Sequence, residues 1–200
     1  MHKNITTKKN KTFCLLKKGT IIALMVLASA NLKAQDKNSL LENNLFKINI
    51  LSPGVSYEKR LGENSTLNSD LNLSLGFSYN SNSGSHLLTT AYLREQYRYY
   101  YNIEKRSLKN KNIKNNSANF VALSASYYLE PFGDSGYVSV YDGLTIAPVW
   151  GLQRTYENGI NIALVTGAGY NFGTNQRTSG FVPVINFTLG LVLSKQGKSI

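Results

Sequence analysis

The stretch Thr66-Leu-Asn-Ser-Asp-Leu-Asn-Leu-Ser-Leu-Gly-Phe-Ser-Tyr-Asn80 alternates apolar and polar residues along nearly its whole length. Successive side chains of a β-strand point to opposite sides, so a period of two predicts a strand with one apolar and one polar face. Only Ser69 interrupts the apolar row, which comprises Leu67, Leu71, Leu73, Leu75, Phe77 and Tyr79.

The same alternation recurs to the end of the chain. It predicts six strands, near residues 66–79, 89–102, 118–129, 143–155, 160–172 and 181–194. Residues 45–61 form either one long bulged strand or two short strands joined at Ser52-Pro53-Gly54, where Pro-Gly is a turn signal. With two strands there the total is eight. We therefore expect an all-β fold, an antiparallel up-and-down β-barrel with eight strands.

The polar rows indicate which face is buried. They consist mainly of Asn, Ser, Thr, Gly and Ala, whereas the outward rows of a soluble sandwich or lipocalin-like barrel usually carry Lys, Glu, Asp and Arg. Small polar rows fit a narrow interior, and large apolar rows on the outside fit lipid, which favours a transmembrane β-barrel. A soluble periplasmic β-barrel that binds an apolar ligand, with its Leu/Phe rows inward, stays open as an alternative.

Segment length and aromatic residues agree with the membrane interpretation. The segments are close to the roughly 9 to 11 residues that a tilted transmembrane strand needs. Aromatic residues at strand ends are typical of interfacial girdles. They are Tyr97, Tyr99 and Tyr101 near one end, and Tyr79, Tyr127, Tyr170 and Phe172 near others.

Residues 1–34 have the layout of a secretory signal peptide: a basic stretch, an apolar run at 20–30, and small residues before Gln35. Cleavage after Ala34 or after Ala30 satisfies the small-residue rule. We expect a short periplasmic segment at 35–43, the barrel at 44–195 and a tail at 196–200. The apolar run is too short for a membrane-spanning helix and no longer one follows. Cys14, the one cysteine of the chain, lies inside the removable segment.

The net charge of +11 is concentrated at the N-terminus, because seven lysines and no acidic residue lie in the first 34 positions. The rest holds 15 basic and 11 acidic residues, a net charge of +4. A net charge of +4 is ordinary for a soluble or surface-exposed chain and does not indicate a nucleic-acid-binding surface, so no nucleic acid partner is expected. With one histidine and no cysteine after residue 34, we expect no metal site, no disulfide and no cofactor.

Several segments together resemble the small outer-membrane β-barrel proteins of Bacteroidota, which have OmpA/OmpX-type eight-stranded barrels, many of them domains of unknown function. They are Ala-Gln35, Phe46-Lys-Ile-Asn49, Val55-Ser-Tyr-Glu58, Arg94-x-x-x-Arg98-Tyr-Tyr-Tyr101-Asn and Gly167-x-Gly-Tyr-Asn-Phe172-Gly. The resemblance covers about residues 44–195. The resemblance concerns the architecture and implies no catalytic residues. Our leading hypothesis is a non-enzymatic, monomeric protein of the cell outer membrane with a structural, adhesive or surface-interaction role. Its partners would be outer-membrane lipid and an unidentified extracellular or periplasmic protein.

Strand parity predicts a set of charged and amide side chains inside the barrel. They are Lys47, Asn49, Glu58, Asp70, Arg94, Gln96 and Arg98. An eight-stranded barrel is only wide enough for side chains to fill it. We therefore expect a polar plug in which charges neutralise each other, with Glu58 paired to Arg94 or Arg98. An ion-conducting or ligand-gating interior is the alternative. Glu95 falls on the apolar face, through a bulge or at an interface.

The connections predict two further features. Loops near 80–88, 130–142 and 173–180 share one end, and turns at 62–65, 104–116 and 156–159 share the other. The first loop holds Ser85 and His86, and with Glu130 these suggest an outer-membrane lipid-modifying hydrolase as an alternative function. The turn from Lys105 to Lys114 is strongly basic, which fits either a solvated charge run or the binding of anionic lipid headgroups.

Overall fold

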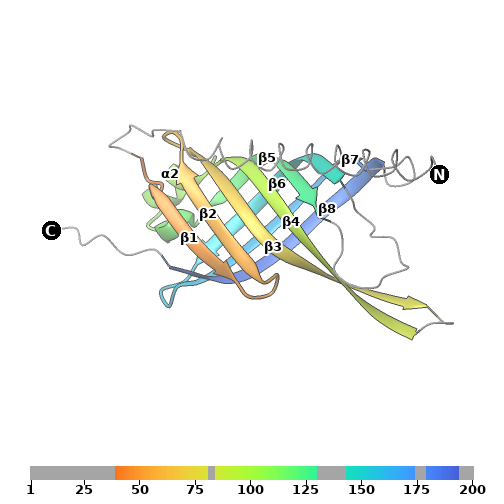
Figure 1. Ribbon diagram of the computed structural model, residues 1–200. Helices are drawn as coiled ribbons and strands as arrows, with labels where there is room; N and C mark the ends of the chain where they lie inside the picture. The colour runs from red at the N-terminus through yellow and green to blue at the C-terminus, as the bar shows by residue number, and fades with distance from the viewer. Residues whose placement is uncertain (1–38, 81–83, 130–142, 174–178, 194–200) are drawn as a thin grey trace, which may run out of the picture. The chain divides into compact units, whose positions relative to one another are not determined.

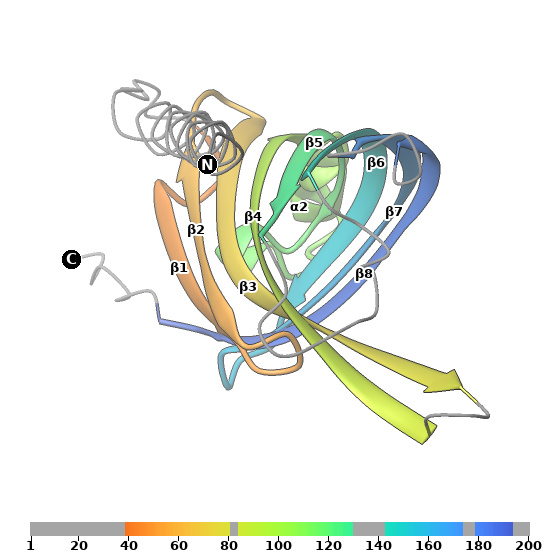
Figure 2. The same ribbon diagram turned by 45° about the vertical axis from the view of Figure 1, so that its right-hand side comes forward.

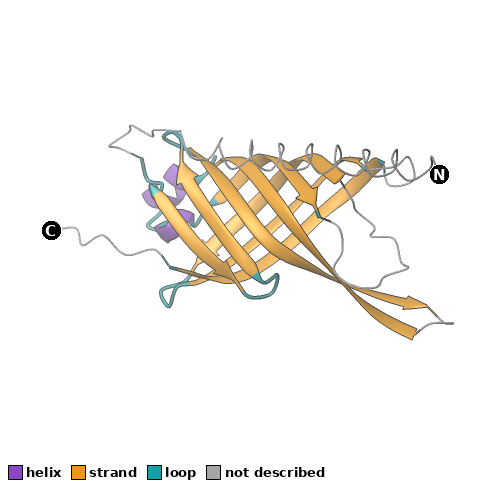
Figure 3. Ribbon diagram, viewed as in Figure 1, coloured by secondary structure: helices purple, strands orange, loops and turns teal. Residues whose placement is uncertain are grey.

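The computed structural model describes residues 39–80, 84–129, 143–173 and 179–193 of the chain, apart from the side chains of residues 75–89. Within them, eight antiparallel strands form a closed barrel in which each strand pairs with the next and β8 pairs with β1 (Figures 1 and 3). The prediction of an all-β, eight-stranded, up-and-down barrel is confirmed. The strands are β1 (Asn44–Asn49), β2 (Gly54–Arg60), β3 (Ser65–Asn80), β4 (Gly84–Tyr99), β5 (Asn119–Tyr128), β6 (Gly143–Thr155), β7 (Ile160–Phe172) and β8 (Gly180–Val192).

The N-terminal segment forms two strands, β1 and β2, separated by a turn that contains Pro53. Gly54 begins β2 directly opposite Asn72 of β3. A Cβ at Gly54 would collide with the carbonyl oxygen of Leu71 and the side chain of Asn72, so the close approach of the two backbones requires glycine here. The Pro-Gly turn signal therefore marked a real strand boundary.

Alternate residues of each strand face the inside and the outside of the barrel, and the polar rows are the inner ones. On β1, Lys47 and Asn49 are buried while Phe46 and Ile48 are exposed on the outer wall. The most exposed outward side chains lie on β8, where Phe181 and Ile185 are 89% and 76% exposed. The expected arrangement of polar rows inside and apolar rows outside is confirmed for the part of the chain that the structure describes.

The connection between β4 and β5 is more than a turn. It contains a short helix, α2 (Ile103–Leu108), and a 3-10 helix, η1 (Lys114–Asn116). Figure 2 shows α2 at one end of the barrel, near the beginning of β5. Ile103 of α2 is buried in an apolar cluster with the inward-facing Tyr100, Phe120, Val149 and Val165. The helix and this cluster close the interior at that end.

The β3–β4 hairpin corrects the expectation of a loop at 80–88. β3 continues to Asn80 and β4 begins at Gly84, with a continuous register from Ser65 opposite Tyr99 to Asn80 opposite Gly84. β2 pairs with β3 only as far as Asn72, and β5 pairs with β4 only from Tyr92 onward. The far part of the hairpin therefore projects past its neighbours (Figures 1 and 2). The sequence analysis placed residues 84–88 in a loop because this segment does not alternate apolar and polar residues.

Among the described residues, no helix is long and apolar enough to cross a membrane.

The apolar cluster generates a stability prediction. Gly151 of β6 lies against the ring of Phe120, and a methyl group at position 151 would collide with that ring. We expect Gly151→Ala to lower the free energy of unfolding by about 1–3 kcal/mol, the usual cost of overpacking a core. Urea unfolding followed by the emission of Trp150, the one tryptophan of the chain, measures it.

A double-mutant cycle with Phe120→Leu provides the control, because the smaller side chain makes room for the methyl group. The double variant should be more stable than the sum of the two single losses implies. Strictly additive losses would contradict the collision.

Candidate functional site

The carboxylate of Glu58 is the centre of a buried polar network, which we call the Glu58 cluster. Glu58 is fully buried, on the inner face of β2. Its two oxygens accept hydrogen bonds from six side chains. Oε2 accepts from Lys47 Nζ at 3.0 Å, Arg98 Nη1 at 3.4 Å and Gln153 Nε2 at 3.5 Å, and Oε1 accepts from Thr66 Oγ1 at 2.9 Å, Tyr100 OH at 2.6 Å and Asn116 Nδ2 at 3.0 Å.

These donors come from parts of the chain that only the closed barrel brings together. Lys47 lies on β1, Arg98 on β4 and Gln153 on β6. Two cations within reach of one carboxylate neutralise it, and the neutral donors fill its remaining lone pairs. A buried carboxylate is tolerated on these terms, because its desolvation is offset by charge pairing and by hydrogen bonds.

Asn116 joins the β4–β5 connection to the Glu58 cluster. It is buried in η1 with a backbone φ of +58°, in the left-handed region that Asn tolerates better than most residues. Its Nδ2 donates to Glu58, and its Oδ1 accepts from the backbone N–H of Glu42 at 2.8 Å. One amide therefore fixes the connection and the segment before β1 to the barrel interior.

A separate ion pair joins Asp70 and Arg94, which lie opposite each other on β3 and β4. Nε and Nη2 of Arg94 both donate to Oδ2 of Asp70 at 2.7 Å. The sequence analysis offered Arg94 or Arg98 as the partner of Glu58. The structure assigns Arg98 to Glu58, together with Lys47, and Arg94 to Asp70.

Gln96 lies between the two arginines on the inner face of β4. Its Oε1 accepts from Nε and Nη2 of Arg98 at 3.1 and 2.7 Å, and its Nε2 donates to Ser124 Oγ at 3.3 Å. The guanidinium of Arg98 also lies 4.5 Å from the centre of the Phe120 ring, a favourable cation–π geometry. All five candidate residues, Glu58, Asp70, Arg94, Gln96 and Arg98, are therefore buried inside the barrel.

Four donors to Glu58 were missed by the sequence analysis: Thr66, Tyr100, Asn116 and Gln153. Thr66, Tyr100 and Gln153 occupy inward positions of the same alternation, so strand parity could have identified them. Asn116 lies in a connection without periodicity, and no sequence signal points to it.

Beside Arg94 the interior contains a cavity of about 360 Å³, lined by Tyr92, Ser126, Thr145 and neighbouring residues of β8. Its lining combines hydroxyl groups with one paired arginine, which suits water or a small polar group.

Glu95 lies on the outer wall, as parity predicts, and its pairing on both sides is continuous. The bulge offered as an explanation is therefore wrong. Ser69 Oγ of β3 donates to Glu95 Oε2 at 2.8 Å, which gives the carboxylate one polar neighbour on this wall.

The residues of the hydrolase alternative are placed differently from the expectation. Ser85 and His86 belong to β4, opposite Tyr79 and Ser78, and not to a loop. Their side chains and the whole of Glu130 lie outside the described residues. The part of the chain that is described contains no group of three or more His, Cys, Asp or Glu side chains that could hold a metal ion.

Comparison with known proteins gives no relative: no family model, curated protein or solved structure matches the chain.

The Glu58 cluster predicts a large effect of one conservative substitution. Glu58→Gln keeps the shape of the side chain but leaves Lys47 and Arg98 buried without their carboxylate. We expect the free energy of unfolding to fall by about 3–5 kcal/mol, the usual cost of removing one partner of a buried ion pair. Urea unfolding of the folded barrel measures it.

Glu95→Gln is the matched control, because the same change on the outer wall separates no ion pair and should cost far less. A Glu58→Gln variant as stable as Glu95→Gln, or a stable one that conducts ions, would contradict the interpretation of the cluster as a plug.

Proposed function

We propose that this protein is a small β-barrel of the cell outer membrane, with a structural or surface-interaction role and an interior plugged by polar side chains. It would be an OmpA/OmpX-type barrel of the kind that its sequence resembles, and it would not act as a general porin.

The observation that carries this proposal is the distribution of apolar and charged residues across the barrel wall. Large apolar side chains cover the outer wall, including Leu71, Leu123 and Phe187, while Lys47, Glu58 and Arg98 are buried inside. A water-soluble barrel keeps its apolar side chains inside and its charges outside. Contiguous apolar surface on this scale favours an apolar surrounding such as lipid.

Aromatic residues support the same proposal. Tyr97, Tyr99 and Tyr101 are all about half exposed on the outer face at the α2 end. Tyr170 and Phe172 are exposed near the opposite end of β7. Two separated groups of outward aromatic residues are typical of the girdles at the two interfaces of a membrane barrel.

The buried clusters favour a plugged interior over a porin channel. An eight-stranded barrel leaves room for side chains and not for a wide aqueous pore. The Glu58 cluster and the apolar cluster under α2 occupy this space from wall to wall near one end. The soluble alternative required Leu/Phe rows that line the interior, and in the described strands these rows lie on the outside.

Membrane fractionation of the expressed full chain tests the proposal. We expect recovery in the outer membrane and a mobility on SDS gels that changes when the sample is boiled, because a closed barrel resists SDS until it is heated. Recovery as a soluble periplasmic protein would overturn the proposal.

A charge on the outer wall gives a second, quantitative test. Leu123, 58% exposed near the middle of β5, would face the hydrocarbon of a bilayer. We expect Leu123→Arg to destabilise the barrel in vesicles by about 2–4 kcal/mol.

Leu108 of α2 is the matched control, because its side chain is 86% exposed but lies outside the strands. Leu108→Arg should be nearly neutral. Equal and small effects of the two substitutions would show that water surrounds the outer wall.

A further inference from the structure

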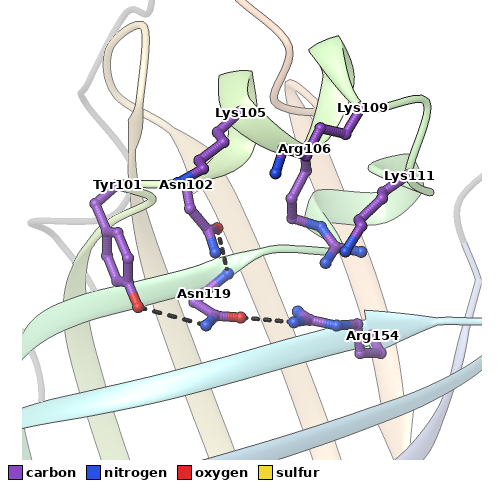
Figure 4. A pocket seen from close by; sticks show the side chains of 8 residues that line it. All are labelled: Tyr101, Asn102, Lys105, Arg106, Lys109, Lys111, Asn119 and Arg154. Carbon is purple, nitrogen blue, oxygen red and sulfur yellow. Dashed lines mark hydrogen bonds between the residues drawn. The ribbon is translucent and has the colours of Figure 1, made fainter.

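A basic pocket of about 550 Å³ lies between α2 and the outer wall of β5 and β6, and we call it the rim pocket. Figure 4 shows the side chains around it, with Lys105, Arg106, Lys109 and Lys111 projecting from α2 and the residues after it, and Arg154 from β6. Five basic residues therefore line one pocket, and no acidic residue does.

Within the part of the chain that the structure describes, no ion pair neutralises the charges of the rim pocket. The ion pairs found among the described residues, Lys47 with Glu58, Arg98 with Glu58 and Arg94 with Asp70, all lie inside the barrel. Like charges held this close repel each other unless an anion or high salt intervenes. The five cations thus make the pocket a favourable place for an anion.

The two arginines provide directed donors as well as charge. Arg154 is positioned by donating from Nη2 to Asn119 Oδ1 at 2.6 Å and from Nη1 to the carbonyl of Gln153 at 2.7 Å. Arg106 donates from Nη2 to the carbonyl of Asn112 at 2.8 Å, but its Nε is buried and has no acceptor within the described residues. An unpaired buried N–H beside a cationic pocket is what a bound oxyanion would satisfy.

The position of the rim pocket indicates which anion it meets. Tyr101 borders the pocket, and its hydroxyl accepts from Trp150 Nε1 at 2.9 Å and from Asn119 Nδ2 at 3.4 Å. Outward residues next along β5 are the exposed Val121 and Leu123. The pocket thus opens where an aromatic girdle meets an apolar wall. A ligand that contacts both the basic pocket and the apolar wall beside it has a phosphate group at one end and an apolar chain at the other.

We propose that the rim pocket binds the phosphate headgroup of an anionic lipid, with its acyl chains along the outer wall of β5 and β6. This inference rests on the membrane location proposed above. The proposal gives the basic residues of the β4–β5 connection a specific ligand. It also means that the barrel prefers one class of lipid at the end where α2 lies. The guanidinium groups of Arg106 and Arg154 contact the phosphate, and the lysines add attraction at longer range.

Trp150 reports binding at this position, because it is the one tryptophan and is hydrogen-bonded to Tyr101. The full chain is placed in phosphatidylcholine vesicles that contain either brominated phosphatidylglycerol or brominated phosphatidylcholine at equal mole fraction. Brominated chains quench tryptophan on contact. We expect stronger quenching by the brominated phosphatidylglycerol, and a preference that weakens as salt is raised.

Two double variants are compared for their preference for phosphatidylglycerol. Lys105→Gln with Lys111→Gln removes two exposed lysines of the pocket and should reduce the preference for phosphatidylglycerol, by about fivefold per lysine or until none is left. Lys59→Gln with Lys114→Gln removes the same charge at two residues that do not line the pocket and should reduce the preference far less. Arg154→Gln provides an independent variant and should also reduce it.

The possible failures are distinguishable. A chain that stays in the aqueous phase overturns both the membrane location and the lipid site. A chain that inserts, with the heat-dependent mobility of a closed barrel, but shows no preference or an equal loss in both double variants, overturns the lipid site alone. Loss of the preference on adding millimolar inorganic phosphate at constant ionic strength would show that the pocket holds free phosphate and would overturn the lipid assignment.

Discussion

The buried carboxylate of Glu58 is the constraint on which the rest of the interior depends. A charge removed from water must be neutralised and hydrogen-bonded, or the fold that contains it is destabilised. Lys47, Arg98 and four neutral donors meet this requirement together, and they come from β1, β3, β4, the residue after β4, β6 and η1. Because no two neighbouring strands supply all of these groups, the network is complete only when the barrel is closed.

The outer wall poses the opposite requirement. Its alternate positions are apolar because each strand has only two faces, and the polar one is used inside. Where the wall ends, the residues change character: Tyr101 and Trp150 form a hydrogen-bonded pair, and beyond them lie the basic residues of the rim pocket. A single alternation of period two thus produces both the polar interior and the apolar exterior. The basic residues of the rim pocket lie at the end of the barrel, mainly in the β4–β5 connection.

Most of the wall could be predicted from sequence, because strand parity is a local property. Glu58, Asp70, Arg94, Gln96 and Arg98 were placed inside by parity alone, and all are buried there. Parity cannot choose partners, since Arg94 and Arg98 share the same face of β4. The strand register decides which arginine pairs with Asp70, because it places Asp70 directly opposite Arg94. The start of β4 at Gly84 was missed because residues 84–88 do not alternate, and their pairing with β3 is a contact that the local pattern does not show.

The sequence by itself determined that the chain forms strands and which face of each is polar, but it left open whether Pro53-Gly54 divides the first segment into two strands. These follow from the period of the side chains and from backbone chemistry that acts within a few residues. The tertiary structure decided the closure of β8 onto β1, the assignment of Arg98 and Asn116 to Glu58, and the gathering of Arg154 with the lysines after α2. Those contacts join residues far apart in the chain, and hydrogen bonds and charge pairs depend on distances that only the closed barrel sets.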